Sequence, residues 1–133
     1  MRICLDTSAY SHFKRGDPQA SKLITSARLV GVPSIVLGEL RTGFLGGSDP
    51  ERNENELQVF LDNPVVRVFD VDDESSHYYA ELVTDLRRAG TPVPTNDIWI
   101  AALSIREGAT VITYDQHFNL MQRSGSKVLH VSH

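Results

Sequence analysis

The sequence predicts an α/β sandwich with a mostly parallel sheet. Short apolar runs that fit strands alternate along the chain with patterns that fit helices, as in folds where helices cover both faces of a parallel sheet. The first of these runs, Ile3-Cys4-Leu5, shows no alternation with polar residues, which indicates a strand that is buried on both faces. The chain of 133 residues has the length of one ordinary domain, so we expect a single domain over residues 1–133. The pattern does not give the order of the strands.

The first expected strand, Ile3-Cys4-Leu5, ends in Asp6-Thr7-Ser8. Ligands of open α/β sheets bind outside the carboxyl ends of the strands. Asp6 is therefore a candidate catalytic residue, and Thr7 and Ser8 are candidate supporting hydroxyl groups. The alternative is that one of these three side chains caps the helix that follows. Cys4 is the only cysteine, and its place in an apolar run favours a small buried side chain over a nucleophile or ligand.

Capping residues, prolines and glycines predict where the other elements begin and end. Asp17 and Pro18 suit the N-cap and the first position of a helix, and Asp49 and Pro50 repeat this pattern. Gly90 follows the basic residues that close a long helix. The expected helices cover residues 8–15, 18–26, 33–44, 51–62, 74–89 and 96–105. The expected strands after the first cover residues 29–30, 65–69, 110–113 and 127–131.

Three further carboxylates have positions that fit either a functional or a structural role. Glu39 borders the apolar face of its helix. A glutamate that only faced solvent would be expected on the opposite face of the helix. Asp97 lies in the first turn of a helix that is apolar nearly all round, and Asp115 follows the strand at 110–113. The structural alternatives are a solvated glutamate, an aspartate that pairs with the helix dipole, and a turn residue.

Taken together, the four carboxylates Asp6, Glu39, Asp97 and Asp115 predict one metal site. Asp6 and Asp115 each follow a strand, and in a parallel sheet both strands end at the same edge. Carboxylates that crowd together repel each other unless a cation neutralises them. Oxygen ligands without cysteine or histidine suit Mg²⁺ or Mn²⁺ rather than zinc. Such an ion activates water and stabilises charge on a phosphate, so hydrolysis of a phosphodiester is the reaction that fits.

The formal net charge of −4, from 17 acidic and 13 basic residues, at first speaks against a nucleic-acid partner. Without the four candidate acids, however, the acidic and basic residues are equal in number. A cation-loaded site can therefore accept an anionic polymer. Candidate bases to hold that polymer are Lys14, Arg15, Arg41 and Arg52, which are equally typical of solvated surface.

These motifs together resemble the PIN domain, and specifically the VapC toxins of bacterial and archaeal toxin–antitoxin pairs. The resemblance covers essentially the whole chain, and its four acidic motifs occur in the order of the family. The motifs of this chain that carry the resemblance are Asp6-Thr7-Ser8 after the first strand, Glu39 on a helix, Asn96-Asp97-Ile98-Trp99-Ile100-Ala101-Ala102 and Thr113-Tyr114-Asp115-Gln116-His117-Phe118.

The resemblance implies a three-layer α/β/α sandwich with a five-stranded parallel sheet. It also implies an endoribonuclease that depends on Mg²⁺ or Mn²⁺, a homodimer, and inhibition by a VapB-type antitoxin. The metal ligands that it implies are Asp6, Glu39, Asp97 and Asp115, with Thr113 as a supporting polar group. From the same resemblance we expect Phe118 to pack in the core and His117 to support the ligands at most.

Two other functions stand beside a metal-dependent endoribonuclease. A phosphatase of the haloacid-dehalogenase type also has an aspartate after its first strand, but it needs a second aspartate where this chain has Ser8. A PIN-like module that binds RNA or protein without cutting RNA is the second. We expect a cytoplasmic protein without a membrane segment, because no apolar run approaches the roughly 20 residues of a membrane span and the N-terminus lacks a signal-peptide pattern.

Overall fold

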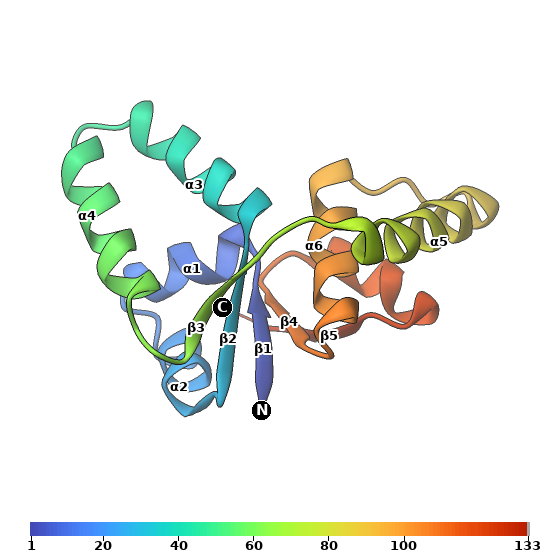
Figure 1. Cartoon of the computed structure of the whole chain (residues 1–133), viewed down its shortest axis with the longest axis horizontal. Helices are drawn as coiled ribbons and strands as arrows, with labels where there is room; N and C mark the ends of the chain where they lie inside the picture. Colours follow the sequence, from blue (N-terminus) through green and yellow to red (C-terminus); the bar gives the residue numbers. More distant parts are fainter. Residues whose placement is uncertain (133) are drawn as a thin grey trace.

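The structure is a computed structural model that describes residues 1–132. Its five strands are all parallel and lie in the order β3-β2-β1-β4-β5. From β1 in the centre the chain first adds β2 and β3 on one side, and then β4 and β5 on the other (Figure 1). The direction of winding therefore reverses between β1 and β4, which is where open α/β sheets bind ligands. The strands are β1 (Arg2–Leu5), β2 (Leu29–Pro33), β3 (Val66–Phe69), β4 (Thr110–Thr113) and β5 (Lys127–His130).

Helices cover both faces of this sheet, which confirms the predicted α/β sandwich. Figure 1 shows α1 to α4 to one side of the strands and α5 and α6 to the other. Within residues 1–132, no helix combines the length and the hydropathy that crossing a membrane requires. The helices are α1 (Thr7–Lys14), α2 (Pro18–Ser26), α3 (Ser34–Leu45), α4 (Pro50–Leu61), α5 (Asp73–Ala89), α6 (Thr95–Arg106) and the 3₁₀ helix η1 (Gln116–Ser124).

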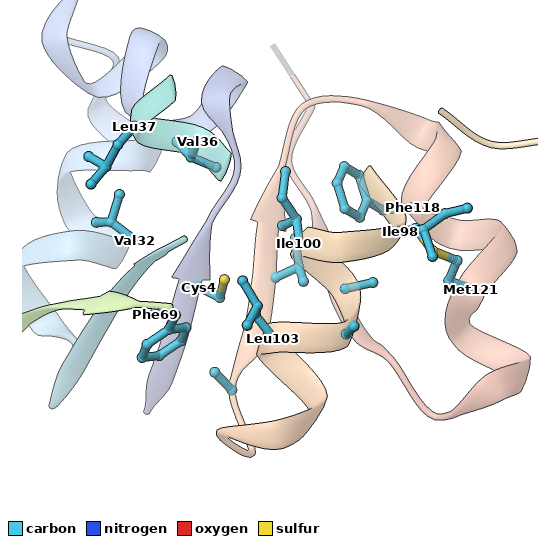
Figure 2. Packing of buried hydrophobic residues seen from close by; sticks show 14 of the residues in the cluster. Cys4, Val32, Val36, Leu37, Phe69, Ile98, Ile100, Leu103, Phe118 and Met121 are labelled. Carbon is cyan, nitrogen blue, oxygen red and sulfur yellow. The ribbon is translucent and has the colours of Figure 1, made fainter. Parts of the chain in front are cut away.

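The side chains of β1 alternate between the two faces of the sheet. Ile3 and Leu5 pack in one buried cluster with residues of α1 and α2. Cys4 belongs to the other cluster, where it lies near Leu103 of α6 (Figure 2). Its thiol is fully buried, and this burial raises its pKa far above the ordinary value. Cys4 is therefore a core residue, as predicted.

Helix α6 is the most enclosed helix of the sandwich, as its apolar sequence predicts. Its residues 100–104 are all buried. Ile100 and Leu103 lie on the side of the sheet, whereas Ile98 lies near Phe118 and Met121 of η1 (Figure 2). Helix α6 is thus held between the sheet and η1, which fixes the position of Asp97 in its first turn. Phe118 is fully buried, as expected.

The predicted boundaries of most elements are confirmed to within about two residues. Asp17 and Asp49 cap α2 and α4 by accepting backbone N–H groups, and Gly90 ends α5 in the left-handed conformation. Two predictions were incomplete. Strand β2 continues to Pro33, because Gly31 pairs with both β1 and β3 and the last two residues pair with β3. The 3₁₀ helix η1 was not predicted.

Gly31 leaves room for the ring of Phe69 on the neighbouring strand. A Cβ atom at position 31 would lie 2.0 Å from two atoms of that ring, and Phe69 is itself only 1% exposed. We expect Gly31→Ala to lower the free energy of unfolding by about 1–3 kcal/mol, because the packed core must shift to accept the methyl group. Chemical denaturation of the purified protein measures this loss.

Gly43→Ala in α3 is the matched control, because a Cβ there meets no atom within 4 Å. This variant should be slightly more stable than the parent, since a glycine within a helix costs roughly 0.5–1 kcal/mol relative to alanine. The double variant Gly31→Ala with Phe69→Leu should lose less stability than the two single losses combined. Full additivity would show that the ring of Phe69 is not the obstacle.

Candidate active site

A hollow of about 620 Å³ opens at the carboxyl ends of β1 and β4, where the winding of the sheet reverses. All four carboxylates predicted from the sequence line this site hollow, together with both predicted hydroxyl groups of the first motif. Neither lysine nor arginine is among its lining residues. These residues are Asp6, Thr7, Ser8, Glu39, Pro94, Thr95, Asn96, Asp97 and Asp115.

Asp6 is a buried carboxylate whose two oxygens both accept hydrogen bonds. Its Oδ1 accepts the backbone N–H of Ala9 at 2.8 Å and the hydroxyl of Ser8 at 2.7 Å, and its Oδ2 accepts the hydroxyl of Thr113 at 2.5 Å. Asp6 is therefore the N-cap of α1 as well as a site residue. The capping role that the sequence offered as an alternative therefore belongs to Asp6, which also lines the site hollow, and neither Thr7 nor Ser8 is the cap.

Burial raises the pKa of Asp6, and the nearby Asp115 carboxylate raises it further. The hydrogen bonds that Asp6 accepts from Thr113, Ser8 and Ala9 lower it. Because a buried carboxylate needs hydrogen-bond donors to remain charged, these donors offset part of the cost of burial.

The hydroxyl groups of Ser8 and Thr113 connect Asp6 to the segment that carries Asp115. Ser8 Oγ accepts the backbone N–H of Tyr114 at 3.0 Å, and Thr113 Oγ1 accepts the backbone N–H of Asp115 at 2.9 Å. Each hydroxyl thus donates to Asp6 and accepts from the turn after β4. Thr113 is completely buried behind the site hollow, which fits the supporting role expected for it.

Glu39 reaches the site from α3 and is held by two side chains from other helices. The Thr7 hydroxyl donates to Oε1 at 2.5 Å, and the Asn96 amide donates to Oε2 at 3.4 Å. Glu39 is therefore no ordinary solvated glutamate. The contact of Asn96 was not predicted, although this residue lies in the quoted motif next to Asp97.

Asp97, Asp115 and His117 offer ligand atoms that lie close together. One oxygen from each aspartate lies within 4.8 Å of the other and of a ring nitrogen of His117, and His117 Nδ1 is 3.1 Å from Asp115 Oδ1. Burial raises the pKa of Asp97 to about 6, with further increases from the Asp115, Asp6 and Glu39 carboxylates. His117 therefore contacts Asp115, which fits the supporting role expected for it at most. All three of the other carboxylates act on the charge of Asp97.

This donor set fits a divalent cation. Several carboxylates share one hollow. Burial, and then repulsion by the other carboxylates, disfavours the charged form of Asp97, and neither lysine nor arginine lines the hollow. Carboxylate and amide oxygens are the ligands that Mg²⁺ and Mn²⁺ prefer. The structure therefore offers an acidic site of the kind that a metal ion stabilises.

The bases that the sequence suggested for holding a polymer are mostly engaged elsewhere. Arg41 forms a two-bonded ion pair with Glu54, at 3.0 Å for both bonds. Arg52 and Lys14 both contact Glu56, at 3.3 Å each. These pairs within α1, α3 and α4 leave those cations less available for a phosphate backbone.

Comparison with known proteins identifies the family. Residues 3–123 match the PIN domain. Ribonuclease VapC4 of Mycobacterium tuberculosis is 36% identical over 91 residues, which are 68% of this chain and 70% of that protein. Ribonuclease VapC2 of Rickettsia felis is 33% identical over 92 residues, 69% of this chain and 67% of that protein.

A solved structure agrees over nearly the whole chain. The VapBC2 complex from Rickettsia felis, bound to a DNA fragment from its promoter, superposes with a TM-score of 0.82 at 26% identity, over 99% of this chain and 100% of that one. The matched family, the curated relatives and the fold agree, and the chain belongs to the PIN-domain family as a VapC-type toxin ribonuclease of the type II toxin–antitoxin systems.

Proposed function

We propose that the four carboxylates of the site hollow are the metal-binding and catalytic residues of this ribonuclease, with Mg²⁺ or Mn²⁺ as the cofactor. The observation that carries the proposal is that Asp6, Glu39, Asp97 and Asp115 line one hollow without a lysine or arginine. The hollow lies where the winding of the sheet reverses, which is the usual ligand site of such sheets.

Each part of the chain has a defined task in this site. Asp97 and Asp115 provide oxygens that lie within 4.8 Å of each other for an ion, and Asp6 is held in a single orientation by Ser8 and Thr113. Thr7 and Asn96 fix Glu39 at the opposite border. When bound, the cation supplies Lewis-acid activation of water and neutralises charge on the phosphate.

The reaction is the hydrolysis of an RNA phosphodiester. A water oxygen attacks phosphorus in line, the bond from phosphorus to the 3′ oxygen breaks, and the products carry a 5′-phosphate and a 3′-hydroxyl. Asp6 is poorly suited to act as a covalent nucleophile, because both of its oxygens accept hydrogen bonds inside the protein. This disfavours the phosphatase alternative, in which that aspartate attacks phosphorus itself.

The partners that we propose are a VapB-type antitoxin and a second copy of this chain. The solved relatives from Rickettsia felis and Haemophilus influenzae are VapBC assemblies. The crowded carboxylates support the proposal of an antitoxin, because a basic side chain of that partner would form charge-assisted hydrogen bonds with them.

Replacing Asp6 by asparagine should abolish cleavage without unfolding the protein. An amide oxygen can still accept the N–H of Ala9, so the cap of α1 is kept. We expect the cleavage rate with Mn²⁺ to fall at least about 100-fold, since loss of even an outer partner of a metal site typically costs 10- to 100-fold. Gel analysis of an RNA cut by the parent measures this rate.

Asp62→Asn is the control for this variant, because Asp62 is exposed at the end of α4. Cleavage by Asp6→Asn at the rate of the parent, with both proteins folded, would remove Asp6 from the site. Metal-independent cleavage by the parent would reject the cofactor. If the folded parent cuts no RNA with either metal, the non-cutting binding module is the better description.

Metal binding should be visible as stabilisation, independently of catalysis. An ion at 100 times its dissociation constant should stabilise the parent by about 2.7 kcal/mol, measured as a rise in melting temperature when Mn²⁺ is added to the EDTA-treated protein. Asp97→Asn should lose most of this rise. An equal response in both proteins would place the ion elsewhere.

In metal-free buffer the same variant should be more stable than the parent, and the difference should depend on pH. The pKa of Asp97 in the folded protein, about 6, lies above the ordinary 3.8. The stability gained by protonating Asp97 is therefore fully present below about pH 3.8 and is lost as the pH rises through about 6. Asp97→Asn should raise the melting temperature more at about pH 8 than at about pH 5, and a constant difference would contradict the crowding of charge.

A further inference from the structure

Two further hollows extend the site hollow toward α5 and η1. The first, called the apolar hollow, has a volume of about 380 Å³ and shares Thr95 with the site hollow. The second, called the arginine hollow, has a volume of about 420 Å³ and shares Leu86 and Thr91 with the apolar hollow. The three hollows therefore adjoin one another, and together they are called the depression, which leads from the carboxylates to the C-terminal end of α5.

The apolar hollow has the size and lining of a small-ligand pocket. Tyr79 and Val83 of α5 line it together with Pro92 and Val93 of the loop that leads to α6. The Tyr79 ring is stacked on Trp99 with centroids 3.9 Å apart and an angle of 14° between the planes. An aromatic ring is thus held rigidly at the wall of the hollow. Arg87 is the one charged residue in its lining.

Three arginines along this depression form no ion pair within residues 1–132. Arg87 lines the apolar hollow, and Arg88 and Arg123 line the arginine hollow, where Asp85 is the one acid. All three are exposed. The lysines and arginines that form ion pairs in the described chain are Arg2, Lys14, Arg41, Arg52, Arg67 and Arg106. Unpaired arginines are the cations best able to contact phosphates, because no existing pair has to be broken.

We propose that the apolar hollow binds one unstacked nucleobase of the RNA substrate, and that Arg87, Arg88 and Arg123 hold the phosphates of the strand beyond it. This inference rests on the function proposed above, because the position of the RNA strand is defined by the phosphate that is cut at the carboxylates. Single-stranded RNA is recognised when bases leave the stack and pack on aromatic side chains, while cations follow its backbone.

The order of the three hollows along the surface fits a single RNA strand better than an apolar protein partner. It runs from carboxylates, which need a cation, through an apolar pocket to unpaired arginines. A single RNA strand repeats these chemistries in the same order, as a phosphate, a flat apolar base and further phosphates. A second protein copy that covered the same surface would have to match the three arginines with acids.

The test uses the full chain with Asp6→Asn and a single-stranded RNA oligonucleotide that the parent cuts at one mapped position. The probe series replaces one base at a time by an abasic site, which keeps every phosphate. We expect binding, followed by fluorescence anisotropy, to weaken roughly 5-fold or more at a single position on one side of the cut. An equal affinity for every abasic probe would overturn the base pocket, and no variant of the pocket is needed.

The arginines are tested by the dependence of binding on salt. Each of Arg87→Gln, Arg88→Gln and Arg123→Gln should lower the slope of log affinity against log salt by about 0.7, the value for one phosphate contact on a single strand. Arg28→Gln is the matched control, since Arg28 is exposed before β2 at the opposite end of the strands. Slopes equal to that of the control would overturn the phosphate contacts.

Two further readouts separate this inference from the function on which it rests. Cleavage of the oligonucleotide by Asp6→Asn would show that the proposed catalytic site has failed, whatever the binding data are. The molar mass of each variant, measured by light scattering, tests whether a second copy of the chain covers this surface instead of RNA. A change from dimer to monomer in the arginine variants, with unchanged RNA affinity, would assign the surface to a second copy and overturn the proposal.

Discussion

The hydrogen bonds to the buried Asp6 carboxylate are the interaction on which the site depends. They join the end of β1 to the first turn of α1 and to the last residue of β4. A buried carboxylate that lost these donors would be destabilising, because a desolvated charge needs partners. Since Ser8 and Thr113 also accept the N–H groups of Tyr114 and Asp115, the orientation of Asp6 and the turn that carries Asp115 are fixed together.

The same site carries a conflict between stability and function. Burial and three neighbouring carboxylates disfavour the charged form of Asp97, and neither lysine nor arginine lines the hollow to offset this. A fold selected for stability alone would replace one acid, which is the usual relation between active sites and stability. A cation that entered the hollow would remove this repulsion, so the same unfavourable charge would favour the proposed binding of a metal ion. A metal ion and a basic group of an inhibitor would therefore compete for the same carboxylates.

The sequence was most informative where function and local structure depend on neighbouring residues. The acids that follow strands and the aspartate–proline helix starts were visible as short patterns, and the structure has both. Contacts between distant segments were not visible: Thr7 and Asn96 hold Glu39 from 32 and 57 positions away. The second half of β2 was missed because Gly31 is a poor strand residue. A glycine fits there because the ring of Phe69, two positions further along the neighbouring strand, occupies the space that a Cβ atom would take. The strand order, which locates the site, depends on tertiary packing that no local pattern encodes.

Net charge was the least reliable guide to the substrate, because it ignores which charges are already paired. The bases on α1, α3 and α4 that the sequence suggested are largely neutralised by Glu54 and Glu56. A phosphate that binds such a base must first displace a carboxylate, so the gain is small. The arginines at the end of α5 and on η1 carry no such penalty. Although the net charge of the chain is −4, the side of the site next to these arginines therefore repels an anionic strand less than this net charge suggests. The direction from which the proposed RNA strand approaches the site follows from which bases are already in ion pairs.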